Sequence, residues 1–465
     1  MHVYCVGVAG AGVSALASML QSQGHTVSGS DEAAHPPIST YLDRIGVPFH
    51  NGFDPALLPA QVDVAIVGTS AKLGAENPEV AALQRRGVPC VSFAEFLGAH
   101  TRTRRNIVVA GSFGKSTLTA MIAYLLRAAG RDPGWFIGAV PLDLDRTGNW
   151  GGDPEMVIEG DEYVVSEQDR RSKFLLYEPE HLLISSLTHD HFNMFPTFAS
   201  YQAPFRTLLT QRKHTGALVC ARGYPALLDM ASERQAIWYG LDAVPGQWGA
   251  RVLALGERSR FALVDPSGRS TEVETQMLGL HNIENFVGAA AMLASLDLVP
   301  VEAIAAAAPN FRGVERRLDR KTTRSRVPIY EGFGSSLEKA QSALAAIALH
   351  FPQSRRIVVF EPHAFSWRNR AALPWYDVAF EGASQVVLLP PPLHGADRHG
   401  QLSPEEIAAR VQASGTPCML TPDAAAAQAE LQAMLRPGDV VLLLSSGPLG
   451  GLAQSLPPWA DAAFG

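Results

Sequence analysis

Cysteine is scarce in this chain of 465 residues: there are four, they lie far apart, and none forms a CxxC pair. This spacing argues against a disulfide framework or a cysteine zinc site and favours a reducing cytoplasm. A basic excess is also missing, since the net charge is −7, which argues against a general nucleic-acid binder. The apolar N-terminus lacks a basic leader region and is interpreted as a buried strand and helix. No later apolar run reaches about 20 residues, so we expect no membrane partner.

What the chain does have is a repeated alternation of apolar strands and helices, at a length that suits about three domains of about 150 residues. Near the N-terminus, expected strands at 3–8 and 62–68 alternate with expected helices at 14–24 and 78–87. This rhythm predicts parallel sheets covered by helices. We therefore predict an α/β protein in which each domain is built on a largely parallel sheet with flanking helices. The expected domains are Rossmann-like at 1–100, P-loop ATPase-like at 101–312 and Rossmann-like at 313–465.

The first glycine-rich turn, GVAGAG at 7–12, follows an expected strand and opens an expected helix. Gly7, Gly10 and Gly12 would let backbone amides approach a phosphate at the helix N-terminus. Asp31 ends the next strand, where an acidic residue can bind a ribose or a base. The spacing GxxGxG differs from the dinucleotide pattern GxGxxG and indicates a nucleotide more strongly than NAD. The alternative is that the glycines only permit close strand–helix packing.

The second turn, AGSFGKST at 110–117, is the sharper signal. Glycines free its backbone to wrap phosphate oxygens, a lysine can reach the β- and γ-phosphates, and a hydroxyl can bind Mg²⁺. The loop is one spacing shorter than a strict GxxxxGK[ST], so a purely structural turn is the alternative. The nucleotide-binding residues predicted here are Gly111, Ser112, Gly114, Lys115, Ser116 and Thr117.

Phosphoryl transfer also needs metal ligands, and polar residues follow two apolar strands in the same domain. VIEGDEY supplies Glu159, Asp161 and Glu162, while SSLTHDHFNMF supplies His189, Asp190 and His191. Because the carboxyl ends of parallel strands meet at one crevice, these side chains are expected to approach the second turn. The alternatives are solvated loops for each residue taken singly and a separate HxH zinc site.

Motifs along nearly the whole chain resemble the Mur ligases, the ATP-dependent amino-acid and peptide ligases of peptidoglycan synthesis. The branch that this chain resembles most is the murein peptide ligases, because EGDEY is followed by DRRSKF and the C-terminus contains LSSGPLGGL. Its first turn resembles that of UDP-N-acetylmuramate–L-alanine ligases equally well. In chain order, the matching motifs are GVAGAGVSALA, VSGSD, NPEVAAL, AGSFGKST, VIEGDEY, DRRSKF, HDHFNMF, GLHNIEN, FRGVERR, EPHAFS and SSGPLGG.

The resemblance implies three functions for the three domains. The first would bind a UDP-sugar nucleotide, the second ATP and Mg²⁺, and the third would bring the amino-acid or peptide acceptor. ATP would phosphorylate a muramyl carboxylate, and the acceptor amine would then attack the acyl phosphate through a tetrahedral intermediate. Such chemistry depends on charge neutralisation and positioning more than on covalent participation of the protein.

The resemblance also assigns roles to individual residues. Lys115 would neutralise phosphate charge, and Ser116 with Glu159 or Glu162 and His191 would bind magnesium. His281, Asn282 and Asn285 would meet the adenine side of ATP, and Arg316 or Arg317 would approach the phosphates. The residues expected on the sugar-nucleotide side are Gly7, Gly10, Gly12, Asp31, Thr69, Ser70 and Arg171.

Three segments depart from the family pattern. Phe113 stands where GTHGKT-type loops have histidine, and a phenyl ring cannot hydrogen-bond or titrate. In YEGFGSSLEKA at 330–340, only Glu331 keeps an acid of the usual DDxxHHP-type segment, and Trp367 in EPHAFSWRNR is unexpected. Three hypotheses follow: an active ligase with a changed substrate, a nucleotide-binding homologue without ligation, and an unrelated NAD-dependent enzyme. The GxxGxG spacing and the second phosphate loop disfavour the third.

Overall fold

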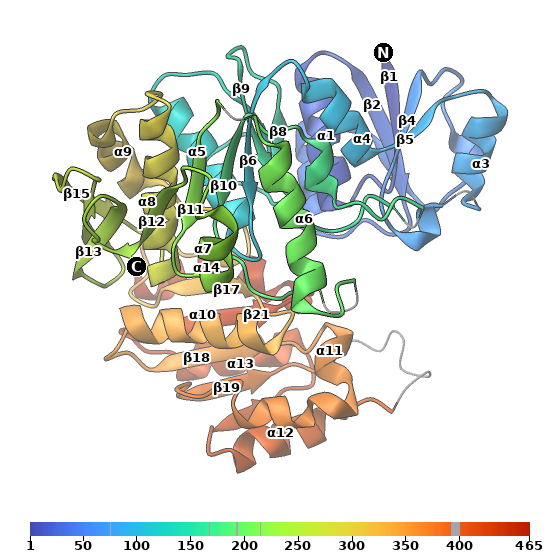
Figure 1. Cartoon of the computed structure of the whole chain (residues 1–465). Coiled ribbons are helices and arrows are strands. Elements are labelled where there is room, and N and C mark those ends of the chain that lie inside the picture. Colours follow the sequence, from blue (N-terminus) through green and yellow to red (C-terminus); the bar gives the residue numbers. More distant parts are fainter. Residues whose placement is uncertain (75, 167, 192–193, 214, 392–399) are drawn as a thin grey trace. The chain divides into compact units, whose positions relative to one another are not determined.

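The computed structural model describes residues 1–465 apart from 75, 167, 192–193, 214 and 392–399. Its contacts divide the chain into two compact units. Unit 1 holds 1–253, 260–275 and 281–314, and unit 2 holds 254–259, 276–280 and 315–465. Three sheets carry the fold, two based in unit 1 and one in unit 2 (Figure 1). The predicted α/β architecture of three largely parallel sheets with flanking helices is confirmed.

The first sheet has five parallel strands in the order β3-β2-β1-β4-β5, and the apolar segment VYCV explains why its central strand is buried. Asn77 caps one flanking helix, and a Ser92–Glu95 capping box begins another. The strands are β1 (His2–Val6), β2 (Thr26–Asp31), β3 (Phe49–Asn51), β4 (Val64–Val67) and β5 (Cys90–Ser92). The helices are α1 (Ala11–Ser22), α2 (Ile38–Ile45), α3 (Pro78–Arg85) and α4 (Phe93–Thr101).

The second sheet has ten strands in the order β15-β14-β13-β12-β11-β10-β6-β9-β7-β8. Its centre is parallel: β6 pairs in parallel with β9 on one side and with β10 on the other. At one edge, β7 and β8 pair with each other in antiparallel orientation. The strands are β6 (Arg105–Ala110), β7 (Gly134–Phe136), β8 (Gly148–Asn149), β9 (Glu155–Glu159), β10 (His181–Ile184), β11 (Leu218–Ala221), β12 (Ile237–Asp242), β13 (Trp248–Ala254), β14 (Ser259–Val264) and β15 (Ser270–Thr275). The helices are α5 (Lys115–Ala128), α6 (Phe198–Gln211), α7 (Pro225–Ala231), α8 (Leu280–Ser295) and α9 (Val301–Ala307).

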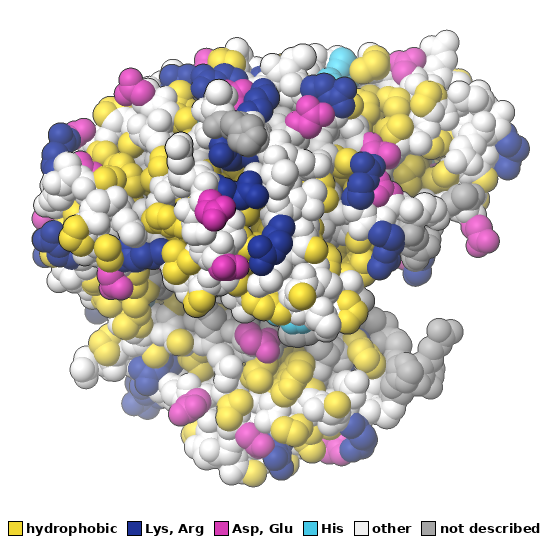
Figure 2. Space-filling view, viewed as in Figure 1, with side chains coloured by type: hydrophobic (Ala, Val, Ile, Leu, Met, Phe, Trp, Pro, Cys, Tyr) yellow, Lys and Arg dark blue, Asp and Glu magenta, His cyan; other side chains and the backbone are white. Residues whose placement is uncertain are grey.

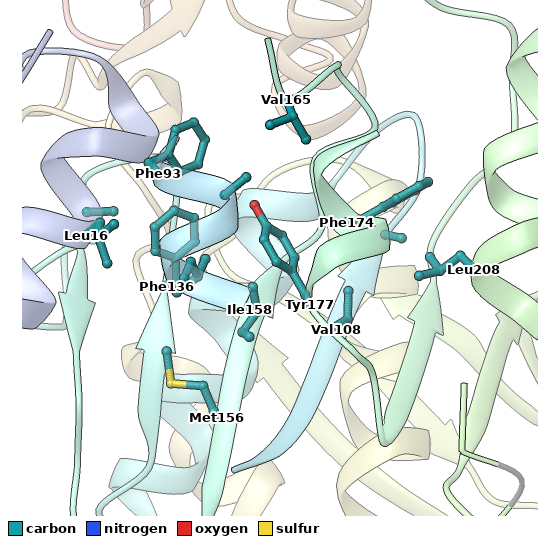
Figure 3. Packing of buried hydrophobic residues seen from close by; sticks show 14 of the residues in the cluster. Leu16, Phe93, Val108, Phe136, Met156, Ile158, Val165, Phe174, Tyr177 and Leu208 are labelled. Atoms are coloured by element: carbon teal, nitrogen blue, oxygen red, sulfur yellow. The ribbon is translucent and has the colours of Figure 1, made fainter. Parts of the chain in front are cut away.

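The first two sheets share one hydrophobic cluster within unit 1. Helix α1 contacts both β2 of the first sheet and β8 of the second. Leu16 of α1, Phe93 of α4 and Phe136 of β7 belong to the same buried cluster as Tyr177, as Figure 3 shows. Because interiors of this kind are close-packed, the cluster holds the carboxyl ends of β1 and β9 near each other.

The third sheet, in unit 2, has the order β16-β17-β21-β18-β19-β20, with only β16 antiparallel. Helix α10 packs on β17 and β21. The strands are β16 (Arg317–Arg320), β17 (Ile329–Phe333), β18 (Arg356–Phe360), β19 (Gln385–Leu388), β20 (Cys418–Leu420) and β21 (Val440–Ser445). The helices are α10 (Leu337–His350), α11 (Phe365–Arg368), α12 (Pro404–Ala413), α13 (Ala424–Met434) and α14 (Leu452–Phe464).

The surface agrees with the mild net charge. On the face drawn in Figure 2, basic and acidic side chains are interspersed among hydrophobic and neutral ones. None of the helices in the described part of the chain is long and apolar enough to cross a membrane.

Candidate active site

The second glycine turn joins β6 to α5, which begins at Lys115, as a phosphate loop requires. Gly111 and Gly114 have φ values of 140° and 80°, which favour glycine. The segment after β10 supports the loop: Ser185 Oγ donates to the Phe113 carbonyl (2.6 Å), and Ser186 Oγ accepts from the Phe113 amide (2.7 Å). The backbone of the loop is therefore fixed independently of the Phe113 ring, which is 47% exposed.

Two ion pairs that share one carboxylate lie beside this loop and connect Lys115, Glu162 and His191. Lys115 Nζ lies 2.8 Å from Glu162 Oε2, and Glu162 Oε1 lies 3.2 Å from His191 Nε2. Burial alone would lower the pKa of Lys115, but the attraction and hydrogen bond of Glu162 raise it overall. The hydrogen bond to Glu162 likewise raises the pKa of His191 against the opposing effect of burial. A positively charged lysine is thus held at the phosphate loop.

Glu159 contacts a different group. Ser116 Oγ donates to Glu159 Oε1 at 2.7 Å, and the Gly138 amide donates to Glu159 Oε2 at 2.6 Å. The carboxylate at the end of β9 therefore joins the first turn of α5 to the loop that follows β7.

The predicted magnesium ligands thus fall into two groups, Ser116 with Glu159 and His191 with Glu162. Asp190 joins the second group, since ligand atoms of Glu162, Asp190 and His191 all lie within 4.8 Å of one another. Carboxylate and hydroxyl oxygens next to a phosphate loop suit Mg²⁺, which usually keeps several waters and binds substrate phosphates as well. The residues present therefore fit this cation. Asp190 belongs to the HDH sequence at 189–191, which the sequence had indicated as a possible source of metal ligands.

The residues expected on the adenine side lie on α8. Asn282 and Asn285 are buried, and Asn285 Nδ2 donates to Asn282 Oδ1 at 3.1 Å. Asn285 also adjoins the phosphate loop, because a Cβ added at Gly114 would lie 3.2 Å from Asn285 Oδ1. His281 is exposed at the start of the same helix.

The two arginines predicted near the phosphates belong to unit 2. Arg316 donates to the carbonyl oxygens of Ser445 (2.8 Å) and Gly447 (2.7 Å) and lies 3.2 Å from Glu331 Oε1. These contacts hold Arg316 against the end of β21. Arg317 begins β16 and is exposed.

A cavity of about 700 Å³ opens at the first glycine turn. Most residues predicted for the sugar nucleotide line it: Gly7, Gly10, Gly12, Asp31, Thr69 and Ser70. Asp31 Oδ2 accepts from the Ala9 amide at 2.9 Å, which fixes the turn. The same cavity extends to the second sheet, where its lining includes Phe136, Gly138, Glu159, Asp161, Lys173 and Tyr177.

Arg171 lies outside this lining: its side chain is 59% exposed and pairs with Asp169 at 2.6 Å. Lys173, two residues later in DRRSKF, is the basic residue that the structure places on the cavity wall. The DRRSKF motif thus contributes one residue to the cavity wall, and burial decides which of its basic side chains faces inward.

The departing segment at 330–340 is ordered by local contacts in unit 2. Ser336 caps α10, and Lys339 Nζ donates to Ser335 Oγ at 3.1 Å. Glu331 of β17 pairs with Arg316 and with Lys321, whose Nζ lies 2.9 Å from Glu331 Oε2. The one acid that survives from the family pattern therefore belongs to a buried charge network.

Family models match three consecutive parts of the chain: "Mur ligase family, catalytic domain" at 2–105, "Mur ligase middle domain" at 109–293 and "Mur ligase, glutamate ligase domain" at 316–447. The UDP-N-acetylmuramate–L-alanine ligase of Roseiflexus sp. (strain RS-1) is 33% identical over 481 residues, covering 96% of each chain. The chain belongs to the Mur ligase family. This Mur ligase is accordingly an ATP-dependent acid–amino-acid ligase, and the NAD-dependent alternative is excluded.

Two further relatives are similar to this Mur ligase over almost its whole length. The UDP-N-acetylmuramate–L-alanyl-γ-D-glutamyl-meso-2,6-diaminoheptandioate ligase of Escherichia coli (strain K12) is 28% identical over 460 residues, covering 98% of this chain and 97% of the relative. The crystal structure of UDP-N-acetylmuramate–alanine ligase from Thermotoga maritima superposes with a TM-score of 0.80 at 18% identity over 100% of both chains, a likeness of fold alone. Both the alanine ligases and the peptide ligase thus resemble the chain over almost its full length.

Proposed function

We propose that this Mur ligase joins the lactyl carboxylate of UDP-N-acetylmuramate to the α-amino group of L-alanine, either free or at the head of a peptide. The names of the Roseiflexus and Escherichia coli relatives support these two acceptors. The DRRSKF and LSSGPLGGL motifs favour the peptide, and thus murein peptide recycling in the cytoplasm. One observation carries the proposal: the cavity at the first glycine turn reaches Glu159, whose carboxylate also holds Ser116 of the phosphate loop. A donor with its nucleotide at that turn would present its far end beside ATP.

We assign each part of the chain one of the three substrates on the same basis. Residues 1–100 would bind the UDP-sugar, 101–312 ATP and Mg²⁺, and 313–465 the acceptor. Lys115 would neutralise the β- and γ-phosphates, and Ser116, Glu159, Glu162, Asp190 and His191 would hold Mg²⁺. Bound Mg²⁺ would supply further neutralisation of the charge on the transferring phosphoryl group.

The reaction needs two displacements. A carboxylate oxygen of the donor attacks the γ-phosphorus, the bond from that phosphorus to the β–γ bridging oxygen breaks, and ADP leaves. The neutral acceptor amine then attacks the acyl carbon, inorganic phosphate leaves from the tetrahedral intermediate, and the surplus amine proton passes to solvent. Lys115 would contribute by holding positive charge where negative charge concentrates in the first step.

The test is phosphate release from ATP with UDP-N-acetylmuramate and a panel of acceptors. We expect release only when donor and acceptor are both present, and comparison of L-alanine with L-alanyl-γ-D-glutamyl-meso-diaminopimelate identifies the acceptor. ATP binding in calorimetry without release for any acceptor would instead support a nucleotide-binding homologue. The observation that favours this second function, nucleotide binding without ligation, is the altered 330–340 segment.

A further inference from the structure

The cavity wall carries one buried cation. Among the described residues that line the cavity, the lysines are Lys72 and Lys173. Lys72 is 66% exposed and pairs with Glu32 at the surface, whereas the Lys173 side chain is only 7% exposed. A buried ammonium group loses its hydration, which costs free energy unless other groups compensate for it. The position of Lys173 on the wall of a ligand-sized cavity therefore suggests a functional role.

Several contacts fix Lys173 in position at the start of the 3₁₀ turn Lys173–Leu176. Its amide donates to the Tyr163 carbonyl at 2.9 Å, and its Nζ donates to Asp161 Oδ2 at 2.7 Å. The ammonium group also lies 5.2 Å and 5.3 Å from the ring centres of Phe93 and Tyr163. Since two rings and one carboxylate hold it, Lys173 presents a pre-positioned positive charge.

A second polar group on the same wall lacks a hydrogen-bond partner among the residues that the structure describes. Tyr177 is fully buried, and its hydroxyl has no hydrogen-bond partner within the described parts of the chain. The residue lines the cavity, and Figure 3 shows its hydroxyl end turned toward the side where Phe93 and Phe136 lie. Buried hydroxyl groups are normally satisfied, so this one is suited to a ligand oxygen.

The charged residues that line the cavity indicate which chemical group of a ligand would bind next to Lys173. Asp31, Glu159 and Asp161 also line the cavity, and their carboxylates would repel an anionic ligand. Lys173 lies on the part of the wall formed by the second sheet's segments, together with Glu159, which contacts the phosphate loop. A carboxylate that must approach the phosphate loop therefore needs a cation here.

We propose that Lys173 is a specificity-determining residue that binds the carboxylate of the donor, with the Tyr177 hydroxyl as a second hydrogen-bond donor to it. This inference rests on the proposed function, because it concerns the carboxylate that would be activated. Lys173 selects a UDP-sugar that carries a carboxylate over one that does not, and it holds that carboxylate on the side of the phosphate loop.

The test is calorimetric titration of the full chain with two ligands that differ in this group. UDP-N-acetylmuramate carries the lactyl carboxylate, and UDP-N-acetylglucosamine lacks it. We expect Lys173→Met to weaken UDP-N-acetylmuramate binding roughly 10- to 100-fold, the range of a hydrogen bond to a charged group, and to leave UDP-N-acetylglucosamine binding unchanged. The matched control is Lys213→Met, which removes an exposed lysine paired with Glu180 and should change neither affinity.

A double variant separates recognition from folding. Lys173→Met alone leaves Asp161 without its cation, whereas Lys173→Met/Asp161→Asn removes both charges. We expect the melting temperature to recover in the double variant and its affinity for UDP-N-acetylglucosamine to equal that of the wild type, which shows that the cavity is still folded. An equal loss of affinity for both ligands in Lys173→Met, or no loss of affinity for either, would overturn the inference alone. Wild-type protein that binds neither UDP-sugar would overturn the proposed function as well.

Discussion

The indole N–H of Trp367 donates a hydrogen bond of 2.9 Å to the carbonyl oxygen of Gly334. Next to it, the Ser366 hydroxyl donates to the Ser335 carbonyl at 3.1 Å. Both bonds join α11 to the segment between β17 and α10, and the Trp367 ring is fully buried in the core of unit 2. Two of the three segments that depart from the family pattern, 330–340 and the segment around Trp367, are therefore bonded to each other, and the tryptophan accounts for the fixed course of the glycine–serine segment.

Replacing this tryptophan tests how much it stabilises unit 2. We expect Trp367→Phe to lower the free energy of unfolding by about 1–3 kcal/mol, because the Gly334 carbonyl loses its donor. Trp367→Ala should cost about 3–5 kcal/mol, since it also leaves a cavity. Urea unfolding followed by far-ultraviolet circular dichroism measures both. Equal stability of Trp367→Phe and wild type would show that the hydrogen bond has no net value.

Lys115→Met should abolish most turnover. The variant removes the cation expected at the β- and γ-phosphates, and loss of one such electrostatic group typically lowers kcat by at least about 100-fold. It also leaves the buried Glu162 carboxylate without its lysine, at a cost of about 3 kcal/mol in folding free energy. Phosphate release and urea unfolding are the measurements. Unchanged ATP binding and turnover in a folded variant would contradict the assignment of this loop.

Phe113→His restores the residue that the family pattern has in the phosphate loop. Because the Phe113 ring is 47% exposed and its backbone groups are held by Ser185 and Ser186, stability should change by less than about 0.5 kcal/mol. A histidine can donate a hydrogen bond, so we expect a lower KM for ATP in the phosphate-release assay. The same KM in both proteins would mean that this side chain does not contact the nucleotide.

Tyr177→Phe isolates the unpartnered hydroxyl of the cavity wall. Removing a buried hydroxyl that has no partner among the described residues should leave the protein as stable as wild type or up to about 1 kcal/mol more stable. Binding of UDP-N-acetylmuramate should weaken at the same time, because a donor to its carboxylate is lost. Thermal unfolding and calorimetry check the two effects, and a clear loss of stability would show that the hydroxyl is already satisfied.

His350 gives the stability of the protein a dependence on pH. Its Nε2 accepts from the Gly279 amide (2.7 Å) and its Nδ1 donates to the Gly256 carbonyl (2.9 Å), an arrangement that requires a neutral ring. Burial lowers the pKa of His350, so below about pH 6.5 the unfolded chain binds a proton that the folded chain does not. The contribution of His350 to stability is complete above that pH and is lost as the pH falls toward the folded pKa.

We therefore expect wild type to lose stability between pH 7.5 and 5.5, and His350→Gln to lose less over the same interval. His100 and His181 also have pKa values lowered by burial, so part of the dependence should remain in the variant. Urea unfolding at both pH values gives the difference. An identical pH-dependent loss in both proteins would exclude His350 as a contributor.

Local patterns in the sequence predicted the parts of the candidate site whose position depends on local backbone geometry. The two glycine turns follow strands and open helices, so Gly7 and Lys115 could be assigned from strand, turn and helix signals alone. The choice between Arg171 and Lys173 could not be made in this way, because it depends on packing against Phe93, far away in the chain. Trp367 was unexpected for a similar reason: its hydrogen-bond partner, Gly334, is 33 residues away.

Glu159 has a consequence for the order in which substrates affect each other. One of its carboxylate oxygens accepts from Ser116 at the phosphate loop, the other accepts from the Gly138 amide, and both Glu159 and Gly138 line the cavity at the first glycine turn. A ligand that rearranges this carboxylate from one side changes the hydrogen bonding offered to a ligand on the other. Thermodynamic linkage then requires the coupling to be reciprocal: the factor by which the UDP-sugar changes the affinity for ATP equals the factor by which ATP changes the affinity for the UDP-sugar.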